Sequence, residues 1–134
     1  MSTPHFLTIA LAHPERYGLR IERTGSALVQ RLEMAGDSTT RRKGLLGRDS
    51  LDRDVGFVIA PTQGVHTFGM RFPIDIVGVS RDGRVVKMRA EVPPKRVVFA
   101  LRAFAILELA PGVARRAAIS VGDCLVVVPS QDAA

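Results

Sequence analysis

The sequence is poor in cysteine and in aromatic residues. Cys124 is the only cysteine among 134 residues, which excludes an internal disulfide framework. Tryptophan is absent and aromatic residues make up 5% of the chain, so the aromatic platforms on which single-stranded nucleic acids stack are missing. Helix-turn-helix and zinc-finger spacings are missing as well. We therefore expect no specific nucleic-acid binding.

Long apolar runs are also lacking. None approaches the roughly 20 residues that cross a bilayer, so we expect no membrane span. Residues 6–12 are apolar, but no positive charge precedes them and His13-Pro14 follows in place of a small-residue cleavage site, which is a poor signal peptide. A cytoplasmic location is the resulting expectation.

The charge is unbalanced toward arginine. The net charge is +6, and sixteen of the 19 basic residues are arginine. Guanidinium groups suit bidentate capture of carboxylates and phosphates, although net charge alone speaks only to solubility and non-specific binding. The basic clusters are interpreted as solvated faces or as a docking surface for an acidic partner or membrane headgroups. They are Arg41-Arg42-Lys43, Lys87 with Arg89, and Lys95-Arg96.

Short strand-like runs separated by turn residues indicate a mainly β (α+β) fold. Asp82-Gly83 predicts a hairpin turn, and after it Val86, Met88 and Ala90 alternate with charged residues, as in a half-buried strand. We expect a β-barrel or sandwich of largely antiparallel strands with short helices at residues 39–47 and 113–118. The strand candidates are residues 7–11, 19–23, 27–34, 55–60, 65–70, 74–79, 86–90, 97–101, 104–109 and 125–128.

The domain organisation expected from this pattern is simple. Residues 25–134 form a single mainly-β domain, which fits one hydrophobic core for a chain of this length. Residues 1–24 are an N-terminal extension that contributes one or two strands to the same domain. The oligomeric state is not fixed by the sequence.

Five motifs occur in order between residues 41 and 128. They are Arg42-Lys43-Gly44-Leu45-Leu46-Gly47-Arg48, His66-Thr67-Phe68-Gly69-Met70-Arg71-Phe72-Pro73-Ile74-Asp75, Asp82-Gly83 with Val85-Val86, Leu107-Glu108-Leu109-Ala110-Pro111-Gly112 and Val121-Gly122-Asp123. With them the chain resembles the domain-of-unknown-function family 192 over about two thirds of its length. The resemblance implies a compact, mainly β fold. It carries over no catalytic residue, because no activity is established for the family.

One group of residues suggests ion pairs between a helix and the sheet. At helical spacing Arg41 and Arg48 share a face, while Asp75 and Glu108 lie in apolar strand-like runs where a carboxylate needs a partner. These four residues form either a structural ion-pair network or an anion pocket with one arginine left over.

A second group centres on His66. On a strand His66, Phe68, Met70 and Phe72 project to one face, which is either core wall or, with Cys124, a soft-metal site for an ion such as Cu(I). His66 could also act as an acid or base with Thr67 or Asp75. Cys124 precedes an apolar run and is interpreted as an inert, buried thiol.

The sequence favours a non-enzymatic binding or accessory domain. An arginine-lined groove would take an anionic small molecule or a partner segment, and no cofactor is expected. An enzyme using His66 and a copper or other soft-metal protein using His66 with Met70 remain as alternatives. The candidate ligand-binding residues are Arg41, Arg48, His66, Thr67, Met70, Asp75 and Glu108.

Overall fold

Three β-sheets form the described part of the structure. The computed structural model describes residues 4–35 and 45–130. Within this part the strands are β1 (Tyr17–Ile21), β2 (Ala27–Val29), β3 (Arg31–Met34), β4 (Val55–Ile59), β5 (Gly64–His66), β6 (Ile74–Val79), β7 (Val85–Val92), β8 (Val97–Phe99), β9 (Ala105–Leu109) and β10 (Leu125–Pro129). The helical elements there are α2 (Val113–Arg116) and two 3₁₀ turns, η1 (Thr8–Ala10) and η2 (Pro14–Arg16).

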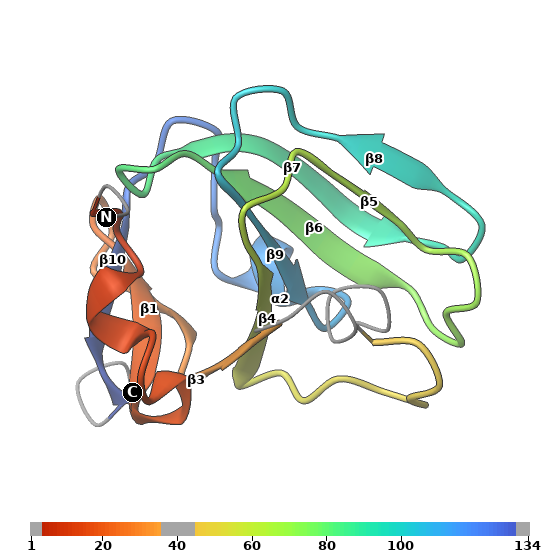
Figure 1. Cartoon of the computed structure of the whole chain (residues 1–134), viewed down its shortest axis with the longest axis horizontal. Helices are drawn as coiled ribbons and strands as arrows, with labels where there is room; N and C mark the ends of the chain where they lie inside the picture. The colour runs from red at the N-terminus through yellow and green to blue at the C-terminus, as the bar shows by residue number, and fades with distance from the viewer. Residues whose placement is uncertain (1–3, 36–44, 131–134) are drawn as a thin grey trace.

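The central sheet has five strands in the order β3-β4-β9-β6-β7. β3 and β4 are parallel, whereas every other pair in this sheet is antiparallel. A three-stranded sheet, β10-β1-β2, lies to one side of it, and β5 pairs with β8 in a separate two-stranded ribbon at the opposite side (Figure 1). The expectation of a mainly β, largely antiparallel fold is confirmed, and the sheets form a sandwich rather than a closed barrel.

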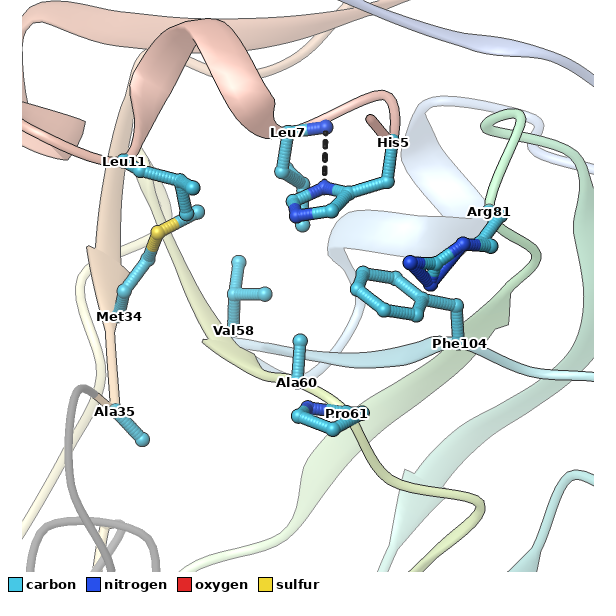
Figure 2. Close-up of a pocket in the computed structure, with 10 residues that line it drawn as sticks. All are labelled: His5, Leu7, Leu11, Met34, Ala35, Val58, Ala60, Pro61, Arg81 and Phe104. Atoms are coloured by element: carbon cyan, nitrogen blue, oxygen red, sulfur yellow. Dashed lines mark hydrogen bonds between the residues drawn. The ribbon is translucent and has the colours of Figure 1, made fainter. Parts of the chain in front are cut away.

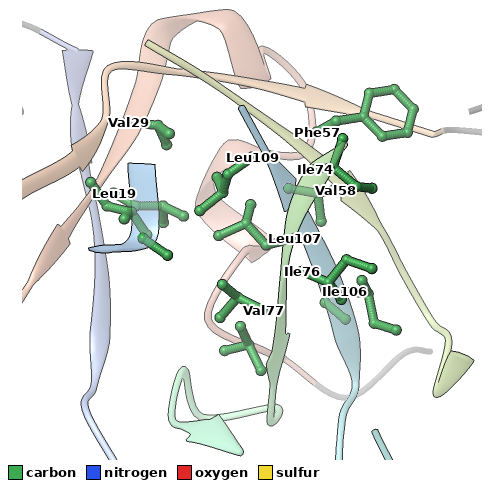
Figure 3. Close-up of a cluster of buried hydrophobic side chains, with 14 of the residues drawn as sticks. Leu19, Val29, Phe57, Val58, Ile74, Ile76, Val77, Ile106, Leu107 and Leu109 are labelled. Carbon is green, nitrogen blue, oxygen red and sulfur yellow. The ribbon is translucent and has the colours of Figure 1, made fainter. Parts of the chain in front are cut away.

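The core lies between the central and the three-stranded sheets. Leu19 of β1 and Val29 of β2 face Leu107 of β9 and Val77 of β6, and all four side chains are buried (Figure 3). Gly56 of β4 lets the two sheets approach, since a Cβ there would lie 2.9 Å from Leu107 and 3.1 Å from Val29. On the other face of the central sheet, Phe57, Ile74, Ile76 and Ile106 form a second buried surface.

The hairpin turn between β6 and β7 holds the N-terminal segment in place. Gly83 has a φ of 91°, as the expected Asp82-Gly83 turn requires. The backbone N–H of Phe6 donates to the carbonyl of Arg81 at 2.8 Å, and the N–H of Leu125 donates to the carbonyl of Gly83 at 2.7 Å. Residues far apart in sequence therefore meet at this turn.

Several expected elements differ in the structure. Residues 7–11, expected as a strand, contain η1, because Leu7 and Ala10 are buried at a spacing of three. The expected strand 27–34 is split into β2 and β3. The strand expected at 65–70 ends at His66, so His66 and Met70 do not share a strand face.

The two expected helices have different outcomes. The one at 113–118 is present as α2, shortened to Val113–Arg116. Of the helix expected at 39–47, residues 39–44 lie outside the described part of the chain, and Leu45 to Gly47 form a turn. Among the helices of the described residues, none is long and apolar enough to cross a membrane.

Candidate functional site

The residues expected to form a site are spread over both faces of the central sheet. His66 ends β5 and is exposed, with its ring centroid 5.9 Å from that of Phe68. Met70 is buried in the following loop. Arg41 lies outside the described residues. No three His, Cys, Asp or Glu side chains gather as a metal-binding group within residues 4–35 and 45–130.

Thr67 fastens one loop to another. Its buried hydroxyl donates to the carbonyl of Pro93 at 2.7 Å and accepts the backbone N–H of Arg96 at 2.8 Å. Its own backbone N–H donates to the carbonyl of Arg96 at 2.8 Å. These contacts tie the end of β5 to the segment that leads into β8, which gives Thr67 a structural task.

Asp75 is fully buried and binds backbone rather than an arginine. One carboxylate oxygen accepts the N–H of Glu91 at 2.7 Å, and the other accepts the N–H of Ala114 at 2.9 Å. Glu91 has a φ of 51° where β7 bends, and Ala114 lies in the first turn of α2. The carboxylate thus holds an irregular strand and a short helix against β6.

Arg48 has a different partner from the one expected. Its guanidinium pairs with the carboxylate of Glu33 at 2.9 Å and lies 5.5 Å from the centre of the Phe57 ring. Glu33 is on β3, beside Phe57 in the parallel β3-β4 register. The Arg48–Glu33 pair therefore covers the outer edge of the sheet instead of neutralising Asp75.

Glu108 is a buried carboxyl without a partner among the described residues. It is 4% exposed, and in the sheet register it lies between Phe57 of β4 and Ile76 of β6. No hydrogen bond or ion pair from the described part of the chain reaches its carboxyl group. Burial raises the pKa of Glu108 to about 7, so the group changes charge near neutral pH.

A concave site of the described residues lies elsewhere, between the N-terminal segment and the central sheet. This cavity has a volume of about 550 Å³, and Figure 2 shows its lining residues arranged around an open space. Most of these residues are apolar, and two have side chains that contain nitrogen. They are His5, Leu7, Leu11, Met34, Ala35, Val58, Ala60, Pro61, Arg81 and Phe104.

The polar groups of the cavity gather around Phe104. The Arg81 guanidinium carbon lies 4.5 Å from the centre of the Phe104 ring, and the His5 ring centroid is also 4.5 Å from it. Nδ1 of His5 accepts the backbone N–H of Leu7 at 3.2 Å (Figure 2). Burial, and secondly the charge of Arg81, lower the pKa of His5 below 6.5. At neutral pH Arg81 is therefore the cation of this cavity.

The sequence gives no prediction of this cavity. Its walls come from η1 and the residues beside it, β3, β4 and the turns after β6 and β8, so no local spacing connects His5, Arg81 and Phe104. The one local signal is the pair Leu7 and Leu11, which share a side of a helical turn but read equally well as a strand.

Comparison with known proteins matches the architecture but gives no activity. The DUF192 family model, described as "Uncharacterized ACR", matches residues 19–127. No curated protein matches. A protein of unknown function from Novosphingobium aromaticivorans DSM 12444 is 29% identical, with a TM-score of 0.65 over 71% of this chain and 73% of that one. A Sinorhizobium meliloti 1021 protein named "putative transcription regulator" is 20% identical, with a TM-score of 0.71 over 93% and 96%, which shows the fold alone.

Proposed function

Since the chain belongs to the uncharacterised DUF192 family, we propose its function from geometry: it is a binding domain for a small amphiphilic anion, held in the cavity beside Arg81. The observation that supports this proposal most directly is one cation at the edge of an apolar cavity. A volume of about 550 Å³ is in the range of small-molecule sites, which are typically apolar with a few convergent polar groups. The sequence predicted an anionic small molecule or a partner segment in a groove lined by Arg41 or Arg48. For this cavity, which is a different site, the dimensions favour a small molecule.

Arg81 would bind the charged end of the ligand. A guanidinium carries five N–H donors, so Arg81 can donate to a carboxylate in addition to its contacts within the protein and its stacking on Phe104. Leu7, Leu11 and Met34 would then contact the apolar body. His5, with its lowered pKa, contributes an aromatic wall rather than a second fixed charge. A linear or branched monocarboxylate with an apolar tail has this chemistry.

Calorimetric titration with three matched compounds tests the proposal. We expect octanoate to bind saturably, octanol to bind more weakly and octylamine not to bind. Arg81→Met keeps an apolar stem and removes the charge, so it lowers octanoate affinity by about ten-fold or more, as the loss of a hydrogen bond to a charged group does. Arg16→Met, at an exposed arginine outside the cavity, leaves the affinity unchanged. Equal octanoate affinity in the wild type and Arg81→Met, or no saturable binding, overturns the proposal.

Methionine methyl groups locate the ligand independently of affinity. Met34 lines the cavity, whereas Met70 and Met88 do not. With methyl-labelled methionine, octanoate therefore shifts the NMR signal of Met34 and leaves those of Met70 and Met88 in place. Binding that shifts Met70 but not Met34 would place the ligand near the loop after β5 and contradict the assignment.

A further inference from the structure

The outer face of the β5-β8 ribbon carries a row of exposed apolar side chains. Val97 and Phe99 are 53% and 62% exposed on alternate positions of β8, and Leu101 continues the alternation at 78%. We call these three residues the apolar ridge. The alternate residues Val98 and Ala100 are buried, so the ridge is the solvent side of a strand whose other side is anchored.

Other apolar and aromatic groups border this ridge. His66 is the cross-strand partner of Val97, and the exposed Phe68 lies against the His66 ring. The ribbon projects at an outer edge of the molecule, away from the three-stranded sheet (Figure 1). Contiguous exposed apolar surface with a polar rim is typical of an interaction site rather than of scattered surface residues.

Cations lie beside the ridge. Lys95 and Arg96 precede β8 directly, and Arg102 follows Leu101; all three are exposed. Lys87 of β7 lines a shallow depression with Phe99, Leu101 and Arg102. The sequence has no aspartate or glutamate in residues 55–74 or 92–107, the segments that contain the ribbon and its flanking loops. Within these described segments the charged residues that flank the ridge are thus cations.

We infer that this face docks on an anionic phospholipid surface, with the apolar ridge inserted at the boundary of headgroups and acyl chains. Cations beside an inserted apolar strip are the combination that peripheral membrane contacts use. The three side chains of the ridge are more than half exposed, and a fluid bilayer covers such an apolar strip without the matching shape that a folded protein partner needs. This surface is separate from the cavity beside Arg81, and neither proposal depends on the other.

Vesicle co-sedimentation gives the first test, with phosphatidylcholine alone and mixed with phosphatidylglycerol. We expect the wild type to bind the mixed vesicles and to bind neutral ones about ten-fold or more weakly, with salt reducing the difference. Each cation near such a surface contributes about five-fold, so Lys95→Gln/Arg96→Gln lowers the partition coefficient by about 25-fold. Arg115→Gln/Arg116→Gln, which removes two exposed charges elsewhere, leaves it nearly unchanged.

The apolar ridge needs its own test, because a basic protein adsorbs to anionic surfaces without insertion. Phe99→Ser/Leu101→Ser changes only exposed side chains and lowers binding by about ten-fold or more, whereas Val121→Ser, at another exposed apolar residue, does not. The chain has no tryptophan, so Phe99→Trp supplies a single indole reporter. Its emission shifts to the blue with mixed vesicles, and that of Val121→Trp does not.

Two results overturn the inference. In the first, Phe99→Ser/Leu101→Ser still co-sediments with mixed vesicles and the emission of Phe99→Trp does not shift. The protein then adsorbs to the surface by electrostatics only. The other is binding of an acidic peptide such as polyglutamate, lost in the same variant, together with no binding to mixed vesicles, which means a protein partner.

Discussion

Glu108 lies opposite Phe57 in the register of β9 and β4, so a carboxyl group is buried beside an aromatic ring inside the central sheet. On the other side of Glu108 the register places Ile76 of β6. Arg48 lies over the Phe57 ring and pairs with Glu33. The carboxyl group therefore meets mainly apolar side chains, which disfavour its charged form.

This burial predicts that the protein loses stability as the pH rises toward neutral. Because the pKa of Glu108 is raised from 4.5 to about 7, the native state holds a proton that the unfolded state has released across this window. The free energy of unfolding then falls with pH between these values, by at most about 3 kcal/mol. Glu108→Gln cannot ionise, so its stability relative to the wild type rises from about pH 5 to about pH 8 in urea unfolding.

Comparing Glu108→Gln with the wild type isolates the effect of Glu108, since all other ionisable groups are the same in the two proteins. Glu22→Gln, the same change at an exposed residue, serves as the control and leaves the pH dependence as in the wild type. If the stability difference between Glu108→Gln and the wild type stays constant from about pH 5 to about pH 8, the carboxyl group is not titrating in this range.

Asp75→Asn tests whether the carboxylate acts through the backbone. An amide cannot accept both the Glu91 and the Ala114 N–H groups, since one of its two ends is itself a donor. We expect a loss of about 3 kcal/mol in the free energy of unfolding, from a buried N–H left unpaired and a lost charge-assisted bond. Hydrogen exchange at the Ala114 amide should accelerate. Asp49→Asn, at an exposed carboxylate, is the matched change, and an equal, small effect of both variants would contradict a fastening role.

Thr67→Val removes a hydroxyl that both donates and accepts in a buried position. The N–H of Arg96 and the carbonyl of Pro93 then lose their partner, and we expect about 1 to 3 kcal/mol of destabilisation. Thr67→Ser keeps the hydroxyl and should retain most of the stability in the same chemical denaturation experiment. A loss in Thr67→Ser as large as in Thr67→Val would show that the methyl group, and not the hydrogen bonding, is what matters.

Local sequence patterns were sufficient to predict the Asp82-Gly83 turn and the mainly β fold class. Asp82-Gly83 determines its own backbone conformation, and the alternation after it gives a strand with one wet face. The strand expected to run from Val65 to Met70 was wrong beyond His66. There the loop is fixed by Thr67 bonding to Pro93 and Arg96, residues about 30 positions away.

The partners of the charged residues also depend on contacts between segments that are distant in sequence. Asp75 was expected to pair with Arg48 because a carboxylate in an apolar run needs a partner and the helix face of Arg41 and Arg48 offered one. The parallel pairing of β3 with β4 places Glu33 beside Phe57, where Arg48 lies. The end of β7 and the first turn of α2 each bring one backbone N–H group to Asp75. Neither arrangement leaves a signal in local spacing, which is also why the cavity around Phe104 could not be foreseen.

Gly83→Ala separates backbone strain from crowding at the turn that holds the N-terminal segment. Its φ of 91° disfavours any side chain, and a Cβ there would lie 2.7 Å from the carbonyl oxygen of Leu125 and 3.4 Å from Phe6. Gly122 has a similar φ of 98° with nothing within 4 Å, so Gly122→Ala measures the strain alone, at about 1 to 2 kcal/mol. We expect Gly83→Ala to cost at least about 1 kcal/mol more in thermal or urea unfolding, because the Leu125 carbonyl cannot move away without losing its strand. If the two variants lose equal free energy of unfolding, β10 and Phe6 move aside without cost. The close approach at Gly83 would then not be what holds the N-terminal segment against the sheet.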